Sequence, residues 1–293
     1  MKTLFLAWQA PNARQWFPIG RLDLSPSAPP AGLGIPSQDP IPAPPHPASY
    51  TFRYTQGVKD AVRCGFHPLA SFPRLGECYR SDRLFPMFQN RVLVETRKGF
   101  AEYLQSLALE TNDPMEILAI TGGERQTDNF EVFPRIEKLP DDSFTCRFFL
   151  HGWRHMPKPA QERAMRLQPG EGLGIAVEMN NPATGIALLL LSRDYEFLGW
   201  TPRYLAEDLF QAVAQMSRLP QAAQGSEGFS AQVVHVNAEG VPANRRVLIE
   251  FKGYLPQGYV PMAGEPFQPY AETVPYLPSP DDTTHSPLPR SLA

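Results

Sequence analysis

Residues 151–155 place two imidazoles, an indole and a guanidinium within five positions, in the order HGWRH. Side chains of these types could bind a metal ion, act as an acid/base pair, contact a nucleic acid or form the polar side of a strand. A metal site needs a third ligand, and the other histidines lie in unrelated sequence settings, two of them among prolines. The pattern therefore argues against a metal, and we expect no other cofactor.

If this segment is a strand, His151, Trp153 and His155 share one face, while Gly152 and Arg154 share the other. A glycine in a strand allows a ligand or another backbone to approach closely. Trp, Arg and His can stack on bases or bind phosphate. The alternative is that Trp153 packs in a core and Arg154 is a solvated surface charge, and the segment alone leaves both open.

The common catalytic signatures are absent from the sequence, which contains no GxSxG, HExxH, Walker or GxGxxG motif. The segment TGGER at 121–125 could cradle a phosphate with its backbone amides, although a Gly-Gly pair more often marks a plain turn. Without a nucleophile or a nucleotide loop, we lean against an enzyme.

The composition limits the choice of ligand. A net charge of −3 over 293 residues excludes a globally basic nucleic-acid binder but not a local basic surface. Residues 146–253 carry 11 Lys and Arg against 10 Asp and Glu, a balance of +1. Such a segment cannot rely on extensive counterion release, so a nucleic-acid site would be small, such as a strand end.

The three cysteines form no CxxC pair and indicate a reduced, cytoplasmic protein. No run approaches the roughly 18 apolar residues of a membrane span, so we expect no membrane partner. The N-terminal apolar run lacks a small-residue cleavage site, and we interpret it as a strand instead of a signal peptide.

Two proline-rich segments flank or interrupt the folded parts. Residues 25–49 carry nine prolines in 25 residues and are predicted to be a surface loop inserted between strands. Residues 254–293 are proline-rich and acidic, and are predicted to be flexible or loosely draped over the body. We therefore divide the chain into three parts, residues 1–142, 143–253 and 254–293.

The first region, 1–142, is predicted to be a small sheet with helices. Strands are expected in TLFLAW, QWFPIGRL, YTFRYT and NFEVFP, and helices in SDRLFPMFQNRV, GFAEYLQSLAL and DPMEILAIT. Ser81 and Asp82 are expected to cap the first helix, and Asp113 the third, with Pro114 at its first position. This order of elements indicates an α+β fold.

The second region, 143–253, is predicted to be mostly strand. Its expected strands are FTCRFFLHGW, GLGIAVEM, GIALLLLS, YEFLGW, FSAQVVHV and RRVLIEFKG. One helix, TPRYLAEDLFQAVAQM, has Thr201 as its expected N-cap and Pro202 at its first position. Short strands with a single helix predict a small, partly open β-barrel.

The second region resembles a HIRAN domain, a small barrel attached to DNA-remodelling helicases and also found alone. The likeness lies in FFLHGWRHM, LQPGEGLGIAVEMNNPATGIALLLL and EFLGWTPRYLAEDL. The positions that match the family pattern are Gly152, Gly170, Asn181, Pro182, Gly199, Pro202, Arg203, Leu205 and Ala206.

The resemblance implies binding of a single-stranded DNA end. Arg154 matches the family's phosphate-binding arginine, His155 takes the place of its aromatic partner, and Arg203 falls near its basic residue at the helix start. Ala183 and Thr184 stand where relatives carry a Tyr-Asp pair, so 3′-end specificity is not implied. Helicase-type hydrolysis would follow only by association, because the chain carries no ATP site.

The first region resembles the N-terminal subdomain of HipA-type toxin kinases. The likeness lies in FPIGRL, YTFRYT, GFHPLASFP, LFPMFQNRV and DPMEILAITGGERQTDNFEVFP. The kinase body does not follow, so this chain is not expected to be a kinase.

We therefore expect a non-catalytic, cytoplasmic nucleic-acid-binding protein. Its predicted contacts are Arg154, His155 and Arg203, with Trp200 or Trp153 as the stacking surface. Trp200 precedes a helix N-terminus, where backbone amides favour a phosphate. The alternative is a protein–protein module that restrains a partner kinase or a toxin or defence effector, which an exposed apolar patch on LFPMFQNRV would favour.

Overall fold

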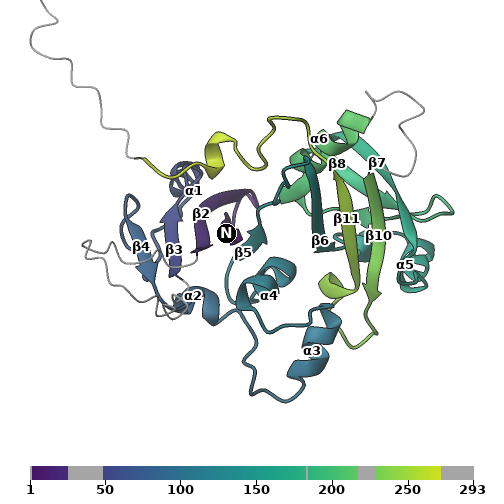
Figure 1. The fold of residues 1–293 in the computed structure, drawn as a ribbon, viewed down its shortest axis with the longest axis horizontal. Coiled ribbons are helices and arrows are strands. Elements are labelled where there is room, and N and C mark those ends of the chain that lie inside the picture. Colours follow the sequence, from purple (N-terminus) through teal and green to yellow (C-terminus); the bar gives the residue numbers. More distant parts are fainter. Residues whose placement is uncertain (1, 26–48, 183, 217–228, 272–293) are drawn as a thin grey trace, which may run out of the picture.

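The computed structural model describes residues 2–25, 49–182, 184–216 and 229–271. Nearly all of the predicted proline-rich loop and the end of the tail, from residue 272 onward, lie outside the described residues. The described chain forms two antiparallel sheets with a few short helices (Figure 1). The predicted α+β class is confirmed at this level.

The first sheet has five strands in the order β4-β3-β2-β1-β5. The strands are β1 (Lys2–Gln9), β2 (Trp16–Ser25), β3 (Ser49–Tyr54), β4 (Cys78–Ser81) and β5 (Phe130–Pro134). Strand β3 pairs with β2 along its whole length, as expected for strands that flank an inserted loop. The four strands predicted for this region are confirmed, and β4 is an addition to them.

Four short helices accompany this sheet, namely α1 (Val58–Arg63), α2 (Pro86–Gln89), α3 (Phe100–Ser106) and α4 (Pro114–Thr121). The Asp113 cap is confirmed, because its Oδ1 accepts the Met115 N–H at 2.8 Å. The cap predicted at Ser81 and Asp82 is wrong. Ser81 ends β4, its Oγ accepts the Arg83 N–H at 3.0 Å in a turn, and the helix begins only at Pro86.

The second sheet has six strands in the order β6-β11-β10-β7-β8-β9. The strands are β6 (Ser143–Phe149), β7 (Gly172–Asn181), β8 (Gly185–Leu191), β9 (Phe197–Trp200), β10 (Phe229–Val236) and β11 (Val247–Tyr254). The chain just after one edge strand, β6, meets the other edge strand, β9, at one isolated bridge between His151 and Trp200. Among the described residues, this bridge is the single pairing between the two edges.

The described residues of the second region contain two α-helices, α5 (Lys158–Met165) and α6 (Ala206–Met216), where the sequence predicted one. The predicted cap on α6 is also wrong. The Thr201 Oγ1 is buried without a hydrogen-bond partner, and a 3₁₀ turn at Arg203–Leu205 precedes the α-helix. Pro202, held at φ −55°, opens that turn.

The two regions share their hydrophobic cores. Strand β1 alternates its side chains, so that Leu4, Leu6 and Trp8 pack in the first core while Phe5 and Ala7 pack in the second. In the other direction, Phe149 and Leu248 of the second sheet pack in the first core. The regions therefore dock as one body. No described helix is both long enough and apolar enough to cross a membrane.

Residues 255–271, here called the strap, run from the second sheet back to the first (Figure 1). Leu255 is fully buried, and the Phe267 ring packs edge-on against Phe5 at 4.9 Å between centroids. The Tyr270 N–H donates to a carbonyl of β3 at 2.9 Å. The predicted loose tail is therefore wrong for the strap, because its apolar side chains complete the core.

Candidate functional site

A cavity of about 610 Å³ lies where the two regions meet. The first region lines it with residues of β1, β2 and the segment from 120 to 131. The second region lines it with residues 149–155, Tyr204 and residues 242–245. This volume lies within the usual range of small-molecule sites, and the HGWRH segment forms one wall.

The HGWRH segment is not a strand. Strand β6 ends at Phe149, Gly152 takes a left-handed conformation with φ 70°, and Trp153–His155 form a 3₁₀ turn. The prediction that alternate residues share a strand face is therefore wrong, because the Gly152 turn reorients the chain. Arg154 and His155 are exposed at the cavity wall, and the Arg154 Nε donates to the His155 Nε2 at 3.3 Å.

The two predicted stacking residues have different roles in the fold. Trp153 lines the cavity, and its Nε1 donates to the Ala243 carbonyl at 2.6 Å. Trp200 lies outside the cavity lining and packs against Gly152, where an added Cβ would meet the ring at 2.5 Å. Of the two, only Trp153 is placed to contact a ligand.

This packing gives a first prediction, for a Gly152→Ala variant. The added methyl would collide with the Trp200 ring, and φ 70° is already unfavourable for alanine. We expect a loss of about 2 kcal/mol in the free energy of unfolding, measured by urea denaturation. Gly170→Ala is the matched control, since φ there is 82° with open space around it. Equal losses in the two variants would contradict the proposed collision.

Arg203 faces a buried carboxylate instead of an open groove. Its Nη2 lies 2.7 Å from Glu131 Oε2, and its guanidinium lies 4.1 Å from the Trp16 ring centroid. The Glu131 side chain is 5% exposed and lines the cavity, whereas Arg203 does not. The structure thus does not bring Arg203 and Arg154 together at one surface, and Arg203 neutralises the cavity's deepest acid.

Three titratable side chains in the cavity wall have shifted pKa values. Burial raises the pKa of Glu131, and Arg203 opposes this shift. Burial and the Arg203 charge lower the pKa of His151 to about 4. Burial, followed by the charge of Glu131, raises the pKa of Tyr204 well above 10. His151 and Tyr204 are therefore neutral at physiological pH, so neither supplies charge to a ligand.

The exposed charges at the cavity favour an anion. Arg125 and Arg154 form no ion pair with a described residue, and Arg245 lies over the Tyr103 ring at 5.9 Å. The lining carboxylates other than Glu131 also form an ion pair or accept a hydrogen bond. Asp128 pairs with Arg91 at 2.5 Å, and Glu124 accepts a hydrogen bond from Asn244 at 2.6 Å.

These pairs determine which charges of the cavity lining are left without a partner. Three lining guanidiniums lack a carboxylate partner, and Glu124 is the one lining carboxylate without a cationic partner among the described residues. The sequence reasoning missed Arg125 and Arg245. Arg125 ends the TGGER segment, for which the sequence suggested a phosphate contact through the backbone amides and not through this side chain.

Those amides are not available to a phosphate. The Gly122 N–H donates to the Leu118 carbonyl at 3.0 Å, and the Gly123 N–H donates to Thr121 Oγ1 at 3.2 Å. The segment ends α4 with Gly122 at φ 70°. A helix C-terminus carries negative partial charge, so phosphate binding by these backbone groups is disfavoured.

The apolar patch that would favour a protein partner is not exposed. Within LFPMFQNRV, the side chains of Leu84, Phe88 and Val92 are buried in the first core. Phe85 and Met87 are partly buried against the same core. The hydrophobic residues of this segment therefore hold the region together instead of forming a docking surface.

No family model, curated protein or solved structure matches this chain. The likenesses to HIRAN domains and to the HipA N-terminal subdomain accordingly remain predictions from the sequence.

Proposed function

We propose that this protein binds single-stranded nucleic acid, holding a strand end in the cavity between its two regions without catalysing a reaction. The observation that supports this most is the pair of exposed guanidiniums, Arg125 and Arg154, that have no carboxylate partner in the described part of the chain. They come from different regions and line the same cavity.

The cavity wall offers both of the contacts that a nucleotide needs. Trp16, Phe130, Trp153 and Tyr204 contribute aromatic rings to the lining. Stacking on such rings is tolerant of sequence, while guanidiniums bind the phosphate oxygens. Arg154 is the proposed phosphate contact, and the hydrogen bond to His155 holds its guanidinium in place.

We also propose that the six-stranded sheet is the partly open barrel expected of a HIRAN domain. The support is the bridge between the two edges. The His151 N–H donates to the Trp200 carbonyl at 3.0 Å, and the Trp200 N–H donates to the His151 carbonyl at 2.9 Å. Closure at this point would place Gly152–His155 at the mouth of the barrel, where the cavity begins.

A strand end fits this site better than a duplex does. The second region carries almost no net charge, so the contacts available for releasing counterions are few. The cavity is also built from two docked regions and holds at most a few nucleotides. Affinity should therefore come from a short stretch inserted into the cavity.

The test compares three forms of one oligonucleotide of about ten nucleotides, measured by fluorescence anisotropy in low salt. We expect the linear single strand to bind at least about tenfold more tightly than the circularised strand or the blunt duplex. Equal binding of the circle would overturn the role of the end. If none of the three binds, the proposed function is wrong.

A further inference from the structure

The turn between β8 and β9 presents an unusually exposed aromatic ring. Tyr195 is 84% exposed, the most exposed large hydrophobic residue of the described chain, and its φ is 62°. A left-handed conformation is costly for a residue with a large side chain. The fold therefore holds this ring in solvent at an energetic cost, and such a cost is typical of residues with a functional contact.

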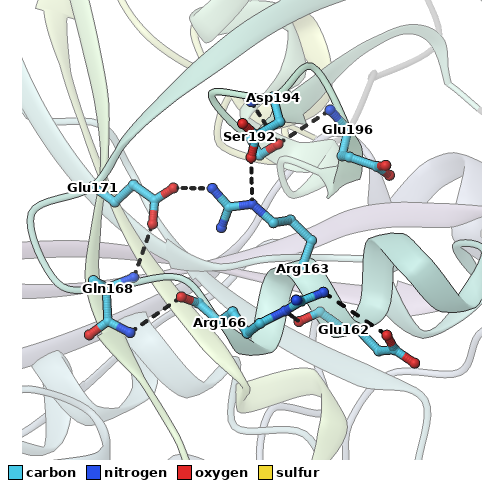
Figure 2. Close-up of polar contacts among 8 residues, drawn as sticks. All are labelled: Glu162, Arg163, Arg166, Gln168, Glu171, Ser192, Asp194 and Glu196. Carbon is cyan, nitrogen blue, oxygen red and sulfur yellow. Dashed lines mark hydrogen bonds and ion pairs between the residues drawn. The ribbon is translucent and has the colours of Figure 1, made fainter.

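The turn is fixed by a polar network, shown in Figure 2. Arg163 of α5 lies between two carboxylates, with its Nε donating to Asp194 at 3.0 Å and its Nη2 to Glu171 at 2.5 Å. The Ser192 Oγ accepts the N–H groups of Asp194 and Glu196, both at 3.2 Å. The ring is thus presented by a rigid turn, which reduces the entropy lost on binding.

The turn is connected to the cavity by two elements. Strand β9 begins two residues after Tyr195 and ends at Trp200, which pairs with His151 of the cavity wall. The five steps from Tyr195 to Trp200 span at most roughly 16 Å, because Tyr195 itself is not extended. Helix α5 packs along β9, starting just after the HGWRH segment and reaching Asp194 through Arg163. Strand β9 and helix α5 therefore connect the HGWRH segment, which holds Arg154, to the turn that carries Tyr195.

The charged side chains on and beside these two elements suit a phosphate backbone. Three cations here, Arg154, Lys158 and Arg193, have no carboxylate partner among the described residues. Glu196 is the one acid beside them that has no cationic partner among the described residues. The other charged side chains here pair with one another. Arg163 binds Glu171 and Asp194, and Arg166 lies 4.0 Å from Glu162. With these pairs included, five cations against four acids leave this part of the chain with a net charge of +1.

We propose that Tyr195 is a second stacking contact for the strand whose end occupies the cavity. This inference rests on the proposed function and adds the direction in which the strand leaves the site. Nucleotides advance about 3.4 Å per residue in a stacked strand, so a path of at most roughly 16 Å corresponds to at most about five nucleotides. A stretched strand would need fewer nucleotides to reach Tyr195. Tyr195 should therefore contact only ligands longer than the cavity alone can hold.

The experiment measures the affinity of single-stranded oligothymidylates of about three and about nine nucleotides for the full chain. We expect Tyr195→Ala to weaken binding of the longer oligonucleotide about tenfold and to leave the shorter one unchanged. Tyr195→Phe should bind both like the wild type, because it keeps the ring. Tyr254→Ala is the matched control. Tyr254 is also an exposed tyrosine, at 43%, and it lies at the C-terminal end of β11, whereas the cavity lining lies before the N-terminal end of that strand.

The outcomes separate the two proposals. If the wild type binds both oligonucleotides and Tyr195→Ala matches it at both lengths, the second contact is wrong and the cavity proposal stands. Equal weakening at both lengths would also overturn the inference, because the ring would then act on the cavity itself. If neither oligonucleotide binds to the wild type, the proposed function fails and the second contact fails with it.

Discussion

An Arg203→Ala variant is expected to lose about 3 kcal/mol of its free energy of unfolding. The Glu131 side chain is 5% exposed, and Arg203 is its ion-pair partner at 2.7 Å. Removing the guanidinium leaves a buried carboxylate that must either stay charged without a partner or take up a proton. The contact of Arg203 with the Trp16 ring is lost as well. The partial exposure of Arg203 keeps the expected loss at the lower end for buried pairs.

The loss should depend on pH in a defined direction. Burial raises the pKa of Glu131 above 4.5, and Arg203 opposes that shift, so removing Arg203 raises the pKa further. The folded variant then holds a proton that the unfolded chain releases, and its stability falls as the pH rises. Urea denaturation should therefore show a larger loss at about pH 8 than at about pH 5.

Two further variants make this result specific. Adding Glu131→Gln to Arg203→Ala should recover part of the stability and remove the pH dependence, because the charge is gone. Arg63→Ala is the control, since Arg63 and Asp60 form an exposed pair and little change is expected. A loss that is the same at both pH values would show that Arg203 stabilises the fold through packing alone.

A double variant, Arg125→Ala with Arg154→Ala, is expected to weaken single-strand binding on the order of 100-fold in low salt. Both guanidiniums are exposed, line the cavity and lack a carboxylate partner among the described residues, so their loss should leave the fold intact. The salt dependence of binding should fall by about one unit of slope for each phosphate contact removed.

The control for this variant removes the same charge elsewhere. Arg80 and Arg83 are exposed in and just after β4 and do not line the cavity. Arg80→Ala with Arg83→Ala should therefore bind within about twofold of the wild type, apart from a general electrostatic effect. If the two double variants weaken binding equally, attraction is non-specific and the cavity is not the site.

Much of the fold was predictable because its signals are local. The alternation of Tyr50, Phe52 and Tyr54 marked β3, and Asp113 with Pro114 marked the start of α4. Helix α5 was missed because its sequence, KPAQERAM, offers only Ala160 and Ala164 to the core. Two small residues give too weak a hydrophobic pattern to indicate a helix.

The candidate site was less predictable because it depends on distant contacts. Arg154 was found from its own sequence setting, but the pairing of Arg203 with Glu131 joins residues 72 positions apart. Nothing local to β5 indicates that Glu131 faces a cation. The docking of the two regions, on which the cavity depends, arises from Phe5 and Phe149 packing in each other's cores. The hydrophobic periodicity within one segment cannot indicate that a side chain packs in the core of the other region.

Photo-crosslinking is the most direct test of a strand end held between the two regions. A single-stranded oligonucleotide with a photoreactive base at its terminus would be irradiated with the full chain, and the linked peptides identified by mass spectrometry. We expect cross-links in both 120–131 and 149–155, and their loss in the Arg125→Ala, Arg154→Ala variant. Cross-links confined to other segments, or unchanged in that variant, would contradict the assignment of the cavity as the binding site.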